Sequence, residues 1–268
     1  MPSKTKGNDK WALILGASSG FGGATSVELA KAGFNICGIH FDRRSSMPAV
    51  NRVKSNIRSK GVKALFFNIN AADEGKRDEA LKILKKETKG VRNPVKLLMH
   101  SLAFGSLLPF VADTKKDAIT KKQVELTLDV MANSLIYWTQ DLIYRNLIGA
   151  GGQIISMTSA GGHVVWPNYG AVSAAKASLE SHTRQLAFEL AKKKIAVNCI
   201  QAGVTDTPSL RKIPANDKMI ERALNANPSG RLTKPQDVAK IITMLALMES
   251  NWVTGNIIRA DGGEDITG

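Results

Sequence analysis

The stretch Trp11-Ala-Leu-Ile-Leu15-Gly16-Ala-Ser-Ser-Gly20-Phe-Gly22 places an apolar run directly before a cluster of glycines. An uninterrupted apolar run predicts a strand that is buried on both faces of a sheet. The residues that follow, 24–32, have the pattern of a helix that ends at Gly33. Glycines between a strand and a helix let the backbone approach a phosphate, and the helix N-terminus supplies N–H donors and positive potential. The stretch therefore predicts the phosphate-binding turn of a nucleotide site.

Strand-like and helical segments alternate along the rest of the chain. Strands are expected at residues 11–15, 35–40, 64–69, 96–100, 153–157, 195–200 and 256–259, and further helices at 48–59, 76–89, 130–148, 167–192 and 236–248. Ser46 is the expected N-cap of the helix at 48–59. This alternation predicts an α/β fold in which residues 11–268 form one domain around a doubly wound, mostly parallel, seven-stranded sheet of the Rossmann type. The turns after the strands would then gather along one edge.

Composition narrows the class of protein. The first ten residues are polar and basic, which predicts a flexible tail and no signal peptide. No apolar run approaches the roughly 18 residues that span a membrane. Cys37 and Cys199 both fall in expected strands, which favours buried, reduced thiols in a cytoplasmic protein.

The net charge is +14, from 37 basic and 23 acidic residues. The lysine clusters at 115–116, 121–122 and 192–194 are scattered and do not alternate with aromatic residues, so no nucleic-acid groove is predicted. Two explanations of the charge stay open. The lysines are solvated surface groups, or they steer an acidic partner toward the protein.

The end of the second expected strand bears on the choice of dinucleotide. Folds that bind NAD usually place an acidic residue there to hold the ribose hydroxyls. Here that position is His40, followed by Phe41-Asp42-Arg43-Arg44. Two adjacent guanidinium groups favour a 2′-phosphate, and hence NADPH over NADH. The alternatives are that Asp42 takes the acidic role and that both arginines are plain loop cations.

Tyr169 and Lys176 stand seven residues apart in a segment with helical periodicity. Seven steps of about 100° fall roughly 20° short of two helical turns, so both side chains would share one face. A lysine beside a tyrosine favours the phenolate and offers a cation to a nearby oxyanion. The pair therefore indicates reduction of a carbonyl or a conjugated enone, although an amphipathic helix can carry such a pair by chance.

Over nearly its whole length the chain resembles the short-chain dehydrogenase/reductase family. The glycine motif from Gly16 to Gly22, the Tyr169/Lys176 pair and the closing Ile258-Arg-Ala-Asp261-Gly-Gly263 stand in the family's order. Most members have Tyr-x-x-x-Lys, which would require a tyrosine at Val172. The six-residue gap resembles the enoyl-[acyl-carrier-protein] reductases, as do His100-Ser-Leu-Ala-Phe104 and Met131, which stands where most relatives carry a proton-relay asparagine.

Two features differ from the commonest enoyl reductases. Their glycine loop is longer, and they carry a second tyrosine ten residues before the catalytic one, where this chain has Ser159. A glycine loop of the present type with Tyr-x6-Lys is similar to the NADPH-dependent subgroup sometimes called type III. Either Ser159 or Thr158 assists Tyr169, or neither does.

The resemblance implies NADPH-dependent reduction of the 2,3-double bond of a trans-2-enoyl thioester, carried by coenzyme A or by an acidic acyl carrier protein. It implies Tyr169, Lys176, Thr158 and Ser159 as candidate catalytic residues. It also implies a homotetramer with the helices at 130–148 and 167–192 at the interface. The residues expected to bind the cofactor are Gly16, Ser18, Ser19, Gly20, Phe21, Gly22, His40, Arg43, Arg44, Asn68, Ile69, Ser101, Leu102, Ala103, Lys176, Thr205 and Thr207.

Residues 208–229 are weakly patterned and predict a mobile lid over the acyl chain, or else a plain surface helix at 216–226. The expected lid side chains are Met219, Ile220 and Leu224, and His163 and Trp166 are candidates to line the pocket. His163 has no partner ligands at metal spacing, so no metal site is predicted.

Three other functions compete with the enoyl reductase. The nearest is a carbonyl reductase or alcohol dehydrogenase of the same fold, acting on a 3-oxoacyl thioester or a hydroxysteroid. A non-catalytic NADP(H)-binding protein and a nucleic-acid-binding protein are the others.

Overall fold

A computed structural model of the chain describes residues 9–267, so most of the expected basic tail, residues 1–8, lies outside the described residues. Its centre is a seven-stranded sheet in the order β3-β2-β1-β4-β5-β6-β7, and every strand pairing is parallel. The strands are β1 (Trp11–Leu15), β2 (Asn35–His40), β3 (Ala64–Asn68), β4 (Val95–His100), β5 (Gln153–Ser159), β6 (Ala196–Ala202) and β7 (Ile257–Ala260). The predicted doubly wound fold is confirmed, with a sheet that is parallel throughout.

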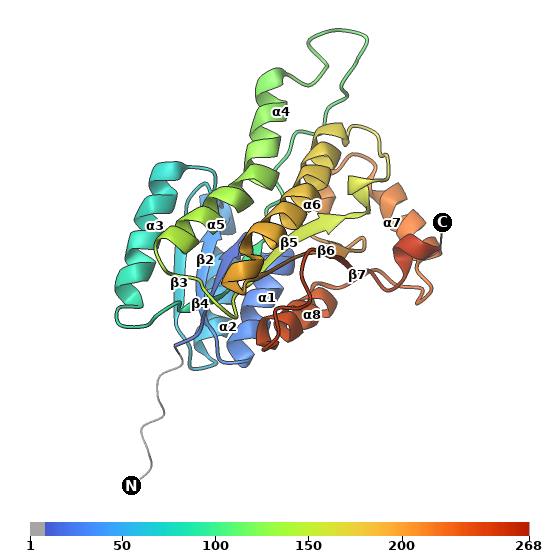
Figure 1. Cartoon of the computed structure of the whole chain (residues 1–268). Coiled ribbons are helices and arrows are strands. Elements are labelled where there is room, and N and C mark those ends of the chain that lie inside the picture. Colours follow the sequence, from blue (N-terminus) through green and yellow to red (C-terminus); the bar gives the residue numbers. More distant parts are fainter. Residues whose placement is uncertain (1–8, 268) are drawn as a thin grey trace.

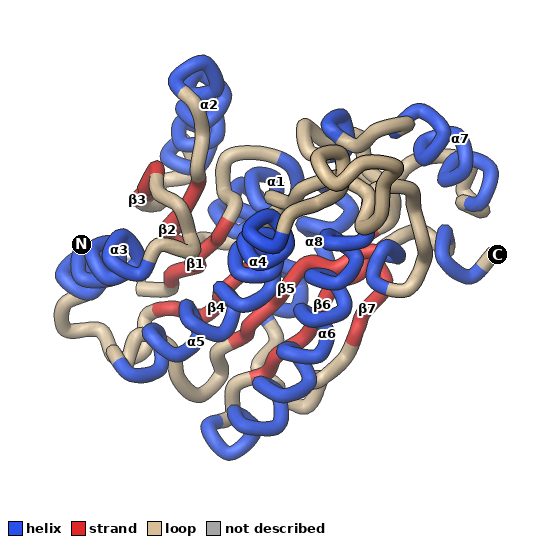
Figure 2. The backbone as a smooth tube through the Cα atoms, turned by 90° about the horizontal axis from the view of Figure 1, so that it is seen from above, coloured by secondary structure: helices blue, strands red, loops and turns tan. Residues whose placement is uncertain are grey.

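Helices cover both faces of the sheet, as Figures 1 and 2 show. One face carries α1 (Gly20–Lys31), α2 (Met47–Arg58) and α8 (Pro235–Leu247), and the other carries α3 (Glu74–Glu87), α4 (Lys121–Leu128), α5 (Ser134–Tyr144) and α6 (Gly170–Leu190). The helix α7 (Asn216–Ala226) lies apart from both layers, near the C-terminal end (Figure 1). No helix of residues 9–267 is both long enough and apolar enough to cross a bilayer.

Side chains on the two faces of β1 pack into two separate hydrophobic cores. Leu13 and Leu15 pack into the core under α3, α5 and α6, and the alternate residues Ala12 and Ile14 pack into the core under α1 and α8. Successive side chains of a strand point to opposite faces, so a strand buried on both sides must be apolar at every position. Cys37 and Cys199, on β2 and β6, are buried and free, as predicted.

The helix expected at 130–148 is wrong in its bounds. The helical path already begins with α4, passes through a π-helical turn at Asp129–Asn133 and continues as α5. A sequence signal for the earlier start exists. Thr120 Oγ1 accepts from the Gln123 backbone N–H, and the Gln123 side chain accepts from the Thr120 N–H, which is a capping box.

The helix expected at 167–192 begins later than predicted, because α6 starts at Gly170. Asn168 has φ of 62°, a left-handed conformation that cannot continue a right-handed helix. Tyr169 therefore stands at the N-cap position of α6, where its carbonyl oxygen accepts from the Ser173 N–H at 2.8 Å. Ser46 does occupy the N-cap of α2, but its side chain makes no capping hydrogen bond.

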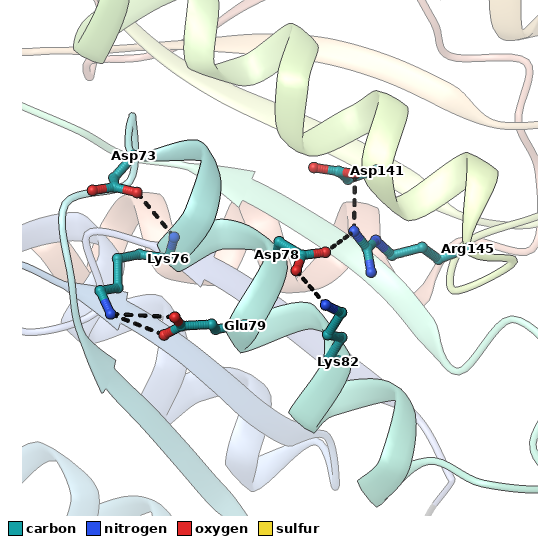
Figure 3. Close-up of polar contacts among 7 residues, drawn as sticks. All are labelled: Asp73, Lys76, Asp78, Glu79, Lys82, Asp141 and Arg145. Carbon is teal, nitrogen blue, oxygen red and sulfur yellow. Dashed lines mark hydrogen bonds and ion pairs between the residues drawn. The ribbon is translucent and has the colours of Figure 1, made fainter.

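Ion pairs join α3 to α5 across the surface of the domain. Arg145 lies between Asp78 and Asp141, at 2.6 and 3.4 Å (Figure 3). The neighbouring Arg77 is 7% exposed and donates from Nε to Asp141 Oδ2 at 2.6 Å. Asp141 is therefore the carboxylate that compensates a buried guanidinium.

We expect Asp141→Ala to lower the free energy of unfolding by about 2 kcal/mol, because Arg77 would keep a buried charge without its carboxylate. Urea unfolding followed by circular dichroism measures the change. Lys82→Ala, which breaks the exposed pair with Asp78, is the matched control and should cost less than about 0.5 kcal/mol. Equal losses in the two variants would contradict this account.

Candidate functional site

A cavity of about 1060 Å³ opens at the carboxyl ends of the strands. In a doubly wound sheet this edge is where ligands bind, because the turns that leave the strands converge there. Most of the predicted site residues line it together: Gly16, Ser18, Ser19, Gly20, Phe21, His40, Ile69, Ser101, Leu102, Ala103, Thr158, Ser159, Tyr169, Lys176, Thr205 and Thr207. Gly22, Arg43, Arg44 and Asn68 do not line it.

The glycine turn after β1 is pressed against neighbouring backbone. Gly16 has φ of 89°, and a Cβ added there would lie 2.2 Å from the Ser101 carbonyl oxygen. A Cβ at Gly22 would lie 2.2 Å from the Gly16 oxygen. Gly22 is thus needed for packing behind the turn, which explains why it is absent from the cavity wall.

The N-terminus of α1 fits a phosphate group. Ser19, Gly20 and Phe21 line the cavity, Ser19 makes no side-chain capping bond, and the first turn contains no acidic residue. The N–H groups of the first turn and the positive end of the helix dipole are therefore available to an anion. The cradle that the two close glycine contacts create suits a dinucleotide pyrophosphate.

The end of β2 holds an acidic residue in the cavity wall after all. Asp42 lines the cavity, its Oδ2 lies 3.0 Å from His40 Nδ1, and its backbone exchanges two hydrogen bonds of 3.0 Å with the Asn68 side chain. Burial lowers the pKa of His40 against the opposing effect of Asp42. Asn68 therefore anchors Asp42 from outside the cavity wall. Arg43 and Arg44 lie just beyond it and are exposed.

Tyr169 is held in the cavity wall by the turn that precedes it. A Cβ at Gly161 would lie 2.6 Å from Tyr169 Cε1, so the ring packs directly on glycine backbone. Burial raises the pKa of Tyr169, and the neighbouring Ser159 hydroxyl opposes that rise. The phenol therefore keeps its proton through neutral pH and is a donor.

Lys176 is 7% exposed and donates from Nζ to the Met157 carbonyl oxygen at 2.7 Å. Burial lowers the pKa of Lys176 to about 8. The group is thus a cation below that pH and loses its charge above it. Tyr169, at the N-cap of α6, and Lys176, further along the same helix, line one cavity.

Two buried polar atoms in the cavity wall have no hydrogen-bond partner among the described residues: Ser159 Oγ and Trp166 Nε1. Buried polar groups are nearly always paired, so these two are available to a bound ligand. Thr158 differs, because its Oγ1 already donates to Glu180 Oε1 at 2.6 Å. Of the two hydroxyls the sequence offered, Ser159 is therefore the one that interacts with Tyr169, whose pKa it lowers.

Much of the rest of the cavity wall is an apolar chamber, although Lys212 and Arg222 also line the cavity. Its wall includes Phe104, Leu107, Val130, Met131, Val164, Val172, Leu210, Ile213 and Met219. Met131 lies in the π-helical turn between α4 and α5. Such a chamber suits an alkyl chain better than a polar ligand.

The segment at 208–229 forms α7, as the surface-helix alternative predicts, and it also lines the chamber. Of the three expected lid side chains, Met219 lines the cavity and Ile220 and Leu224 do not. His163 and Trp166 both line it, as predicted.

Sequence reasoning missed the C-terminal wall. Glu264 and Asp265 line the cavity from the turn after β7. Glu264 accepts from the Val204 backbone N–H at 3.1 Å, and burial raises its pKa. The signal was the pair Gly262-Gly263, whose positive φ angles turn the chain back toward the sheet edge.

The fold and this cavity define the class of dinucleotide-binding enzymes built on one doubly wound domain. A family model described as enoyl-(acyl carrier protein) reductase matches residues 16–264. The chain therefore belongs to the short-chain dehydrogenase/reductase family of NAD(P)-dependent oxidoreductases, and within it resembles the enoyl-[acyl-carrier-protein] reductases.

Individual relatives point to more than one reaction. The chain is 31% identical to the 3-oxoacyl-[acyl-carrier-protein] reductase FabG of Aggregatibacter actinomycetemcomitans, over 94% of this chain and 97% of that one. It is 29% identical to the enoyl-[acyl-carrier-protein] reductase [NADH] FabI of Aquifex aeolicus, over 71% and 70%. A short-chain dehydrogenase from Burkholderia cenocepacia, solved in complex with NADP, has the same fold, with a TM-score of 0.80 and 24% identity over 97% of this chain and all of that one.

We expect Gly22→Ala to weaken binding of the reduced nicotinamide dinucleotide by about tenfold or more, because its Cβ would collide with the Gly16 carbonyl and displace the turn. Titration of NADPH fluorescence measures the affinity. Gly23→Ala, one residue further, is the matched control: its Cβ would meet neighbours at 3.4 Å or more, so binding should be retained. Wild-type affinity in the Gly22 variant would show that the turn does not hold the cofactor.

Proposed function

We propose that the protein uses NADPH to reduce the 2,3-double bond of trans-2-enoyl thioesters, as an enoyl-[acyl-carrier-protein] reductase. The observation that carries the proposal is the arrangement around Lys176. Tyr169 and Lys176 line one cavity, and Val172, where Tyr-x-x-x-Lys would need its tyrosine, is buried and cannot ionise. Tyr169, the tyrosine in the cavity wall, therefore stands at enoyl-reductase spacing from Lys176.

Further support comes from Met131 and from the apolar chamber. Met131 lines the cavity and has no group that can relay a proton. The apolar side chains of the chamber beside it would accommodate a hydrocarbon chain. The description of the matching family model agrees with this reaction.

The reaction assigns separate tasks to the side chains. The glycine turn and the N-terminus of α1 would hold the phosphates, and Lys176 would hold the ribose next to the nicotinamide. When bound, the cofactor supplies a hydride to the β-carbon of the enoyl group. The negative charge that develops on the thioester oxygen is met by the Tyr169 O–H, whose raised pKa keeps the proton available. The Ser159 hydroxyl would orient the phenol.

A 3-oxoacyl thioester reductase is the second candidate, and the FabG relative favours it. That reaction would also use Tyr169 as the acid, but the hydride would add to a carbonyl carbon. The substrate, and not the cofactor site, separates the two activities.

We extend the proposal to the partner, the assembly and the location. The net charge of +14 supports steering of an acidic acyl carrier protein toward the cavity. A homotetramer is the assembly that the resemblance implies. The free, buried Cys37 and Cys199 support a cytoplasmic location.

We expect the wild-type protein to oxidise NADPH in the presence of a trans-2-enoyl thioester. The variant Tyr169→Phe should have a kcat lower by about 100- to 1000-fold, because it lacks the proton donor, and its affinity for NADPH should not change. Absorbance at the nicotinamide band follows turnover. Tyr144→Phe, at a tyrosine that is 79% exposed on α5, is the matched control and should keep full activity. Turnover of a 3-oxoacyl thioester alone would replace the enoyl reductase with the second candidate.

The cofactor preference has its own test. If Arg43 and Arg44 contact the 2′-phosphate, replacing both with alanine should weaken NADPH binding by about tenfold or more. The affinity for NADH should not change. Asp42→Ala should act in the opposite sense, because it removes a carboxylate near the 2′-phosphate. The proposed preference for NADPH would be wrong if the wild-type protein bound NADH more tightly than NADPH and if Asp42→Ala weakened the binding of NADH.

A further inference from the structure

Glu180 is a partly buried acid that the proposed reaction does not use. It lies on α6, one turn after Lys176, and it does not line the cavity. Its Oε1 accepts the short 2.6 Å hydrogen bond from Thr158 Oγ1 at the end of β5. Glu180 therefore lies behind the part of the cavity wall that carries Thr158, Tyr169 and Lys176.

The turn that holds Tyr169 rests on the same carboxylate. A Cβ at Gly162 would lie 2.7 Å from Glu180 Oε1, just as one at Gly161 would lie 2.6 Å from the Tyr169 ring. The turn Ala160–Gly162 is therefore packed between the phenol on one side and the acid on the other. A change at Glu180 would reach Tyr169 through two glycines.

Glu180 also acts electrostatically on Lys176, although the two side chains form no direct ion pair. Burial lowers the pKa of Lys176, and Cys199 on β6 and Glu180 on α6 oppose that effect. The Cys199 thiol is uncharged near pH 8, because burial raises its pKa to about 11. His100 on β4, whose pKa burial lowers to about 3, and Tyr169, whose pKa burial raises, are neutral there too. Glu180, one turn along α6 from Lys176, is then the acid that favours the ammonium form of the lysine.

We propose that Glu180 is a positioning residue of the reductase, which fixes Thr158 and the 160–162 turn from behind the cavity and supplies the counter-charge of the Lys176 ammonium. The inference rests on the function proposed above, because it assigns Lys176 to the cofactor ribose. The carboxylate touches neither cofactor nor substrate. It acts through the three groups that form the wall.

The test is the pH dependence of NADPH binding, measured by cofactor fluorescence without substrate. In the wild-type protein we expect affinity to fall as the pH rises through about 8, where Lys176 loses its proton. Glu180→Gln keeps an oxygen for Thr158 but removes the charge, so the fall should move to lower pH by roughly half to one unit. Glu189→Gln, an exposed acid that binds Gln185 on the same helix, is the matched control and should leave the curve in place.

Glu180→Asp separates charge from position. It keeps the carboxylate but shortens the side chain away from Thr158, so the pH curve should stay and kcat should fall about tenfold. This variant also decides the matter if Glu180→Gln does not fold, since a shifted curve in Glu180→Asp would overturn the role of the charge. A folded Glu180→Gln whose binding curve coincides with that of the wild type overturns the inference directly.

The two proposals can fail separately. A protein that shows the Glu180→Gln shift in NADPH binding but reduces no enoyl thioester refutes the proposed function and leaves the counter-charge in place. A protein that reduces enoyl thioesters and shows no shift refutes the role of Glu180 alone.

Discussion

The site depends on the close approach of two backbone turns at the centre of the sheet. At Gly16 a side chain would meet the Ser101 carbonyl oxygen at 2.2 Å, and at Gly22 it would meet Gly16 at the same distance. The first contact brings the turn after β1 against the turn after β4, and the second packs the glycine turn on itself. The N-terminus of α1 and the turn that resembles the nicotinamide side of related enzymes consequently open into one cavity. A larger residue at either position would separate them.

A second constraint is the burial of charge along α6. Lys176 and Thr183 face β5 from one side of the helix, where Lys176 Nζ meets the Met157 carbonyl and Thr183 Oγ1 meets Ser156 Oγ at 2.9 Å. Burying an ammonium is costly unless its hydrogen bonds and a counter-charge are provided. The strand provides the first and Glu180 the second. The same burial that holds Lys176 in place lowers its pKa to about 8, so the packing of α6 on β5 affects the charge of the lysine.

Much of the fold could be predicted from local pattern, because the inner strands β1, β2, β4, β5 and β6 are apolar enough to be buried on both faces and each ends in a turn. The positions of Gly16, Gly20 and Lys176 in the cavity wall follow from that topology. The path of the chain between β4 and β5 could not be predicted in the same way. The helix α4 is short and mostly polar, and a π-helical turn shifts the register of α5. Periodicity detects long regular helices and loses such interruptions.

The sequence by itself determined three features of the protein. They are the residue chemistry of the nucleotide turn, the spacing of Tyr169 and Lys176, and the succession of strands and helices. Each depends on neighbours a few positions away. Only the tertiary structure decided that Tyr169 precedes its helix and that Asp42 enters the cavity wall. It also decided that Ser159 acts on Tyr169 while Thr158 is held by Glu180. These are contacts between segments far apart in the chain. Their geometry is set by packing, which no local pattern records.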